Sequence, residues 1–182
     1  MVSSAIFWLS MRENMPSQNL NVENLDPADL ALLEALQTDG RLPVVELAKR
    51  INLSPTPVTL RMRRLEQDGV ISGYHARLNP KALGQALMVF VTVSLKATDE
   101  ATLKAFNAAV KPVKPILECH MVGGGFDYLL KIRVRDMSEY RDILGGVIGA
   151  LPMVESTHSY FVMEEVKESP LLPVPKTRER RA

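Results

Sequence analysis

The stretch that most constrains this chain is a short helix with both of its ends marked in the sequence, between Ser54 and Gly69. Ser54 is a residue type that caps the first free N–H groups of a helix. Pro55 is tolerated next because its N–H would be unbonded anyway. Gly69 readily adopts the left-handed conformation that ends helices. These signals predict one helix over residues 54–68.

One stripe of this helix is apolar and the rest is small, polar or cationic. Val58, Met62 and Leu65 stand at i, i+4 and i+7 and therefore share a buried face. The remaining side chains suit a DNA major groove, where Arg binds guanine or phosphate and Thr binds base edges or a thymine methyl. The candidates for contact with double-stranded DNA are Ser54, Thr56, Thr59, Arg61, Arg63 and Arg64. For this helix taken alone, a solvated charged face is an equal alternative.

Two helices are expected before it. The first begins at Asp26, a capping residue, and ends at Gly40; the second covers residues 43–51, and residues 52–54 form a tight turn. Three such helices, the last two joined by a short turn, form a helix-turn-helix whose final helix lies in the groove. Residues 70–78 alternate and are rich in β-branched types, which predicts a short hairpin that forms a wing.

From Leu87 onward strands and helices follow the order β-α-β-β-α-β. The expected strands are 87–95, 116–122, 126–134 and 154–166, and the expected helices are 100–110 and 138–150. This order is a ferredoxin-like split βαβ unit, with one antiparallel sheet and both helices on one face. Apolar residues on both sheet faces are indicated by Val89, Val91, Leu129 and Val162. An apolar face that the chain leaves uncovered predicts association with a second copy, and the fold class is α+β.

Composition limits where DNA binding can arise. The net charge is +1, so any contact with nucleic acid must come from a local patch. The single cysteine, Cys119, excludes an intramolecular disulfide and fits a reducing cytoplasm. No apolar run approaches the roughly 20 residues that cross a bilayer, so no membrane role is expected. We expect residues 1–24 to be a disordered leader and residues 167–182 a disordered basic tail.

Several motifs along the chain, in one order, resemble the Lrp/AsnC family of transcription regulators, closest to its leucine-responsive branch. They are Leu25-Asp26, Asp39-Gly40-Arg41, Glu46-Leu47-Ala48, Leu53 to Pro57, Arg61 to Glu66, Glu118-Cys119-His120, Phe126 to Lys131, Asp136-Met137-Ser138 and Val162 to Val166. The resemblance runs without a break from about Leu25 to Val166. Because the motifs are independent of one another, it is highly specific.

The resemblance implies both architecture and function. It implies a winged helix-turn-helix over residues 25–79, a linker over 80–86, and a RAM/ACT-like sensing and oligomerisation domain over 87–166. It implies a cytoplasmic, nucleoid-associated bacterial regulator of amino-acid metabolism genes that uses no cofactor. Such proteins dimerise through their sheets and assemble further into octamers. A small amino-acid effector, leucine or another, binds between the dimers.

The resemblance also implies where the effector binds. The matching residues are Met121, Gly123, Gly124, Gly125, Asp127, Met137 and Val162. A glycine loop presents bare N–H groups to a carboxylate, and Asp127 could accept the ammonium. Gly125 stands where close relatives often carry an acidic or polar residue, which leaves the identity of the effector open. The alternative is that the glycines are only a turn and Met121 is only core.

Two rival classes follow from the same residues. An enzyme is one, because ferredoxin-like sheets also support catalysis. Its only adjacent nucleophile–base pair is Cys119-His120, and neighbours on a strand point to opposite faces, so a core thiol is expected instead. No metal site is expected, because His75 and His158 belong to no ligand-spaced cluster. An architectural, mostly non-specific DNA protein is the other rival, and it would use the same helix and oligomer.

Overall fold

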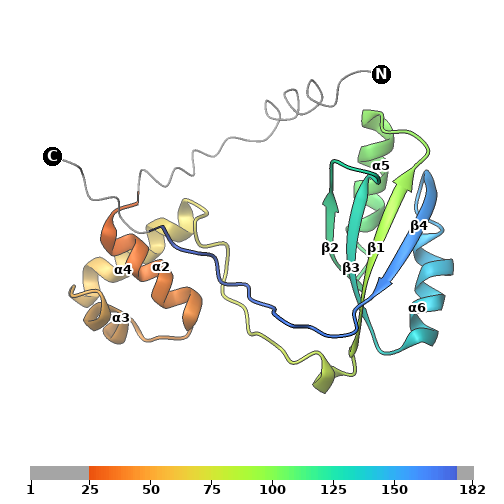
Figure 1. The fold of residues 1–182 in the computed structure, drawn as a ribbon. Helices are drawn as coiled ribbons and strands as arrows, with labels where there is room; N and C mark the ends of the chain where they lie inside the picture. The colour runs from red at the N-terminus through yellow and green to blue at the C-terminus, as the bar shows by residue number, and fades with distance from the viewer. Residues whose placement is uncertain (1–24, 176–182) are drawn as a thin grey trace. The chain divides into compact units, whose positions relative to one another are not determined.

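Residues 25–175 are described by a computed structural model, and they divide into two compact units (Figure 1). The first unit holds residues 25–76 together with 169–175, and the second holds residues 77–168. The expected leader, residues 1–24, and the last part of the expected tail, residues 176–182, lie outside the described residues. Residues 169–175, which were expected to be disordered, belong to the first unit.

Three helices form the first unit: α2 (Pro27–Thr38), α3 (Val44–Arg50) and α4 (Pro55–Gln67). The N-terminus of α2 is a complete capping box. The Asp29 N–H donates to Asp26 Oδ1 at 2.8 Å, and the Asp26 N–H donates to Asp29 Oδ2 at 3.1 Å. Val58 and Leu65 of α4 are fully buried against the other two helices. Gly69 has a φ of +73°, so it ends α4 in the left-handed conformation that the sequence predicts.

The wing does not form the expected hairpin. Residues 70–78 contain no strand, and Val70 and Ile71 instead pack against the helical core. The Ile71 N–H donates to Leu65 O at 3.0 Å, which folds the segment back onto the end of α4. The Tyr74 hydroxyl donates to Glu66 at 2.9 Å. Residues 70–78 are therefore attached to α4 rather than paired with one another as a hairpin.

The second unit is one antiparallel sheet of order β2-β3-β1-β4. Its strands are β1 (Leu87–Leu95), β2 (Ile116–Met121), β3 (Tyr128–Val134) and β4 (Val154–Phe161). Its helices are α5 (Glu100–Val110) and α6 (Met137–Ile143), followed by a π-helical turn η3 (Leu144–Ile148), and a short 3-10 turn η2 (Lys81–Leu83) precedes β1. Both long helices pack on the same sheet face (Figure 1). This confirms the ferredoxin-like fold.

Two elements end earlier than expected. The second helix was expected to reach residue 150, but α6 stops at Ile143 and continues as a wider π-helical turn that contains two glycines. The last strand was expected to reach residue 166, but β4 stops at Phe161. Beyond it, Glu165 turns to the sheet and accepts a hydrogen bond from Arg133 at 2.5 Å. None of the helices described between residues 25 and 175 has the length and apolar character that crossing a bilayer needs.

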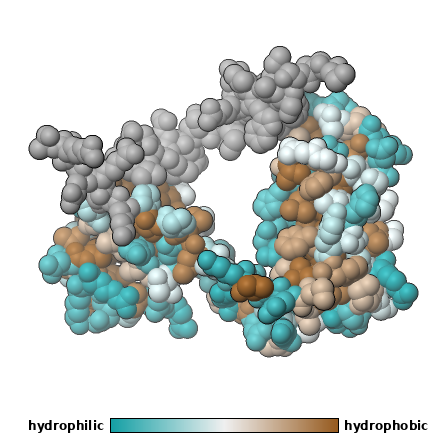
Figure 2. All heavy atoms as spheres, viewed as in Figure 1, coloured by the Kyte–Doolittle hydropathy of each residue, from teal (hydrophilic) through white to brown (hydrophobic). Residues whose placement is uncertain are grey.

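Alternation along the strands separates the two faces of the sheet. Val89 and Val91 are fully buried on the helix-covered face, because residues two apart on a strand share a face. Apolar residues occur on both faces, as the sequence predicts. Val162 lies just beyond the end of β4. Leu129, whose Cα partner is Thr92 of β1, lies on the open face. The cross-strand rows of this open face contain Phe90, Thr92, Leu129, Lys131, His158 and Tyr160. The open face is thus mixed rather than wholly apolar, and Figure 2 shows apolar and polar residues interspersed on the visible side of this unit.

Candidate DNA-binding helix and ligand site

The polar side of α4 faces solvent. Ser54, Thr56 and Arg63 are exposed, while Val58 and Leu65 hold the opposite side in the core. Ser54 occupies the N-cap position but makes no side-chain cap hydrogen bond, and the Thr59 hydroxyl donates to Pro55 O at 3.0 Å. Among the described residues, no carboxylate forms an ion pair with Arg63. The exposed side of α4 therefore offers hydroxyls and one uncommitted guanidinium.

Arg61 and Arg64 are held from behind by a buried carboxylate. Arg61 Nη1 lies 2.5 Å from Asp26 Oδ2 and 2.8 Å from Asp29 Oδ1, and Arg64 Nη2 lies 2.5 Å from Asp29 Oδ2. Asp29 is completely buried, whereas the Arg64 side chain is 47% exposed. A guanidinium has five N–H donors, so both arginines keep donors that are not committed to these pairs. The network fixes α4 against the N-terminus of α2.

The charge state of Asp26 fits this arrangement. Partial burial disfavours its ionised form, but the Asp29 N–H and the Arg61 guanidinium outweigh that effect and hold the pKa of the Asp26 carboxyl below its usual value. The same carboxylates raise the pKa of Arg61, with the hydrogen bond to Asp29 contributing most. Asp26 and Arg61 are therefore both ionised at neutral pH.

The glycine loop between β2 and β3 is open. A Cβ added at Gly124 or Gly125 would meet nothing within 4 Å. The two ends of the loop are joined where the Val122 N–H donates to Asp127 O at 2.9 Å. Its exposed backbone is consistent with a carboxylate-binding loop, and these glycines are not required there by packing.

Asp127 is already engaged by the sheet. One carboxylate oxygen, Oδ2, accepts the Leu95 N–H at 2.7 Å, and the Asp127 N–H donates to Val93 O at 3.0 Å. Asp127 therefore joins the end of β1 to the loop, and only its other oxygen remains for an ammonium group. This structural role was not expected from the sequence.

Met137 and Val162 lie at the other end of the sheet. Met137 begins α6, which follows the last residue of β3, and the Val162 N–H donates to Met88 O at 3.0 Å beside the start of β1. The glycine loop precedes the first residue of β3. Seven residues of strand span about 20 Å, so one protomer does not bring the predicted effector residues together. Met121 lies near the loop, and Met137 and Val162 do not.

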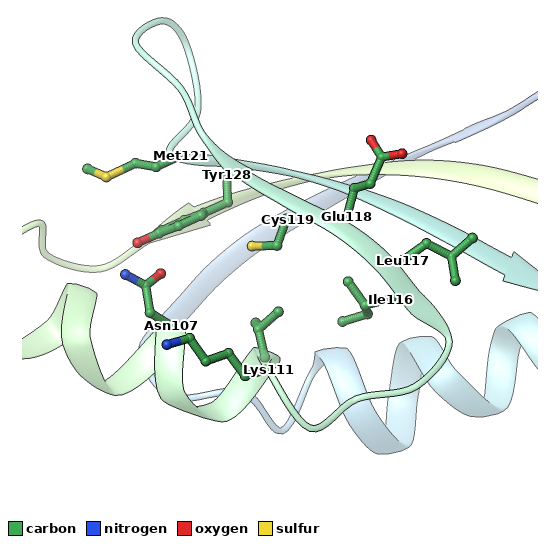
Figure 3. Close-up of a pocket in the computed structure, with 9 residues that line it drawn as sticks. Asn107, Lys111, Ile116, Leu117, Glu118, Cys119, Met121 and Tyr128 are labelled. Atoms are coloured by element: carbon green, nitrogen blue, oxygen red, sulfur yellow. The ribbon is translucent and has the colours of Figure 1, made fainter. Parts of the chain in front are cut away.

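A groove between α5 and β2 contains residues that the sequence did not single out (Figure 3). Its volume is about 470 Å³. It is lined by Asn107, Val110, Lys111, Ile116, Leu117, Glu118, Cys119, Met121 and Tyr128. Met121 is the one predicted effector residue among them. The signal that could have revealed the groove is the alternation of β3, which turns the Tyr128 side chain toward α5.

Cys119 and His120 point to opposite sides, as expected for strand neighbours. Cys119 packs against the helix-covered core, and burial raises the pKa of its thiol. His120 lies 3.2 Å from Glu118 Oε2 and is exposed. No nucleophile–base couple is formed between Cys119 and His120.

Known proteins resemble the whole described chain. Residues 25–72 match the winged helix-turn-helix DNA-binding family, and residues 88–172 match the Lrp/AsnC ligand binding domain. The leucine-responsive regulatory proteins of Escherichia coli (strain K12) and Salmonella typhimurium (strain LT2) are each 51% identical to this chain over 156 residues, which cover 86% of this chain and 94% of theirs.

Solved structures agree with these matches. A transcriptional regulator from Neisseria meningitidis in complex with L-Met has a TM-score of 0.78 and 33% identity, over 82% of this chain and 96% of that chain. An AsnC family transcriptional regulator from Agrobacterium tumefaciens also has a TM-score of 0.78, with 32% identity over 82% of this chain and 97% of that chain. The similarity covers both units.

Proposed function

Because the chain belongs to the Lrp/AsnC family of transcription regulators, we propose that α4 reads operator DNA and that a free amino acid, bound by the second unit, adjusts this binding. The chain is a DNA-binding transcriptional regulator with an amino-acid-binding domain. The relatives are regulators and not enzymes. A regulator of this kind needs one exposed helix that binds DNA and a separate sheet that binds the effector.

The observation that carries the DNA proposal is the division of α4 into a buried stripe and an exposed polar side. Arg63 and Thr56, which are exposed, meet base edges, and Ser54 and Thr59 lie beside them near the backbone. Arg61 and Arg64 hold α4 in place through Asp29 and direct their remaining donors to phosphates. Recognition by α4 thus depends on both the uncommitted and the paired arginines.

The glycine loop is the proposed binding site of the effector, and its chemistry limits the class of ligand. Backbone N–H groups of Gly123 to Gly125 bind the carboxylate, and the free oxygen of Asp127 accepts the ammonium. The relatives are described as leucine-responsive, and one solved relative holds L-Met. We therefore favour a small apolar amino acid, with leucine and methionine as the first to test.

Assembly follows from the separation of the predicted effector residues. Since Met137 and Val162 lie at the far end of the sheet from the loop, a second protomer would have to supply them. Dimers form through the open sheet face, where Phe90 is partly buried and Tyr160 is 58% exposed. Dimers join into octamers with the effector between them. The protein acts on amino-acid metabolism genes at the bacterial nucleoid, in the cytoplasm.

A thermal-shift screen of the full chain against the common amino acids tests the effector. A ligand that binds only the folded state raises the melting temperature. Leucine or methionine should raise it, and the same amino acid should change the affinity for operator DNA in a fluorescence anisotropy titration. If no amino acid shifts melting or DNA affinity, the proposed sensing is wrong, while DNA binding itself is tested separately.

Light scattering tests assembly. A charge placed on the open face, Tyr160→Asp, should reduce the mass of the full chain in solution, because it would be buried unpaired in the interface. Tyr74→Asp, in the first unit, serves as the control because it lies outside the sheet. An unchanged mass for Tyr160→Asp would place the dimer interface elsewhere.

A further inference from the structure

The groove between α5 and β2 ends at a buried hydroxyl that has no partner. Tyr128 is 1% exposed, and among the described residues no group accepts from or donates to its hydroxyl. Its ring is held against Phe106, with ring centroids 4.4 Å apart. A buried polar group without a hydrogen bond costs stability. The protein therefore retains an unpaired donor at this end of the groove.

Two further donors lie beside that hydroxyl. Figure 3 shows the Asn107 amide and the Lys111 ammonium at the same end of the groove as the Tyr128 hydroxyl. Asn107 and Lys111 are both exposed, so their side chains can move to admit a ligand. Burial raises the pKa of Tyr128 by more than the adjacent Asn107 amide lowers it, so the phenol keeps its proton and can donate at neutral pH. Together they offer one positive charge and two neutral donors.

Within residues 25–175, no carboxylate that lines the groove points toward these donors. In Figure 3 the Glu118 carboxylate points away from these donors, and it is bonded to Lys131 at 3.0 Å and to His120 at 3.2 Å. The carboxylate of Asp127 accepts the Leu95 N–H from β1. The rest of the groove is apolar, with Val110, Ile116 and Met121 along its walls.

We propose that this groove binds a monocarboxylate with an aliphatic body and no ammonium group. The carboxylate accepts hydrogen bonds from Tyr128, Lys111 and Asn107, and the aliphatic chain lies over Ile116 and Cys119. A cavity of about 470 Å³ is within the range of small-molecule sites. This site lies within one protomer, and its donors Tyr128, Lys111 and Asn107 differ from those of the amino-acid site at the glycine loop, with which it shares only Met121.

Thiol protection in the full chain tests occupancy. Cys119 is the only cysteine of the chain and lines the groove, so a thiol-reactive dye reports on this position alone. Because burial raises the pKa of Cys119, labelling is run at about pH 8.5, where more thiolate is present. Saturating hexanoate should slow labelling by about fivefold or more. Labelling at an unchanged rate would overturn the site.

Two variants with a matched control test the donors. Lys111→Gln should weaken hexanoate binding about tenfold, measured by calorimetry, whereas Lys114→Gln, an exposed lysine outside the groove, should leave it unchanged. Tyr128→Phe should weaken it about fivefold without lowering the melting temperature of the unliganded protein, because it removes an unpaired hydroxyl. Equal affinity in the parent, Lys111→Gln and Tyr128→Phe would overturn the proposed contacts.

Matched ligands test the chemical class. 1-Hexanol lacks the carboxylate and L-norleucine adds an ammonium to the same carbon chain, so both should protect Cys119 at least about tenfold less well than hexanoate. Equal protection by either compound would overturn the assignment to a monocarboxylate. Asp127→Asn separates the two sites, because it should weaken amino-acid binding and leave hexanoate binding intact. Loss of hexanoate binding in Asp127→Asn would show that the two sites are one.

Discussion

The DNA-binding helix and the sensing sheet hold their candidate residues in contrasting ways. On α4, all six predicted DNA-contact residues lie within or next to one helix, and Asp29 fixes that helix from behind. On the sheet, the predicted effector residues lie at two ends of β3, about 20 Å apart. A site carried by one helix can be recognised from periodicity, whereas a site that joins distant segments depends on topology and on other subunits.

Two aspartates make the contrast concrete. Asp29 binds two arginines and a backbone N–H while completely buried, so its role is to fix α4. Asp127 binds one backbone N–H and keeps a free oxygen at an open loop. Both oxygens of the Asp29 carboxylate are bonded within the fold, whereas only one oxygen of the Asp127 carboxylate is. Substitutions at the two positions should therefore differ in which property they change.

The largest expected effect is on stability at Asp29. Asp29→Ala removes the carboxylate that completes the capping box and leaves Arg61 and Arg64 without their shared partner, so the free energy of unfolding should fall by about 2–4 kcal/mol. Urea denaturation of the full chain measures this. Asp68→Ala, at an exposed position, is the control and should stay within about 0.5 kcal/mol. A parent-like midpoint for Asp29→Ala would show that α4 does not depend on this network.

At Asp127 the expected loss is in ligand binding. Asp127→Asn keeps an oxygen that can accept the Leu95 N–H but removes the charge, so amino-acid affinity should fall by about 1.5–3 kcal/mol while unfolding changes little. Calorimetry with the amino acid found by thermal shift measures it. Asp142→Asn, exposed on α6, is the control. Parent-like affinity in Asp127→Asn would mean that the ammonium binds elsewhere.

A pair of arginine variants sharpens the comparison within α4. Arg63→Ala should cost about 1–3 kcal/mol of operator binding at fixed salt and leave stability unchanged, because Arg63 is exposed. Arg64→Ala should weaken binding equally for operator and unrelated DNA, and should also lower stability, because Arg64 pairs with Asp29. Anisotropy titrations with both DNAs measure the two effects. If the two variants behaved identically, Arg63 and Arg64 could not be assigned different roles, base contact for Arg63 and fixation of α4 for Arg64.

The smallest expected effect is in the acid range at Asp26. The pKa of Asp26 is lowered in the folded state, so its charge stabilises the fold above the unfolded pKa, and this contribution is lost as pH falls through the folded pKa. Asp26→Asn keeps a good capping residue, so near pH 7 it should lose less than about 1 kcal/mol, because Asp26 is 45% exposed. The difference from the parent should shrink as the pH falls below the unfolded pKa of about 3.9, and it should vanish once the pH is below the folded pKa. A difference that is constant with pH would exclude the ionised carboxylate as its source.

Local signals in the sequence predict most of the fold. The ends of β1 and α5 agree with the prediction because each element is bounded by a change of periodicity. The start of α2 at the Asp26 cap and the end of α4 at Gly69 agree as well, because both are marked by local sequence signals. The hairpin over residues 70–78 was wrong, since Val70 and Ile71 pack on the helices instead of pairing with a strand. The partial ordering of residues 169–175 was also missed: Gln37 bonds both backbone groups of Leu172, a contact across the chain that no local pattern reveals.

The sequence by itself determined the helix-turn-helix, the β-α-β-β-α-β order and the exposed side of α4, because each follows from periodicity and capping within a short segment. The tertiary structure alone decided that Arg61 and Arg64 pair with Asp29 and that Asp127 accepts the Leu95 N–H. It also decided that Tyr128 leaves its hydroxyl unpaired above the α5–β2 groove. These contacts join residues more than 30 positions apart or depend on which strands are neighbours, and pairwise geometry of that kind is fixed only when the chain packs.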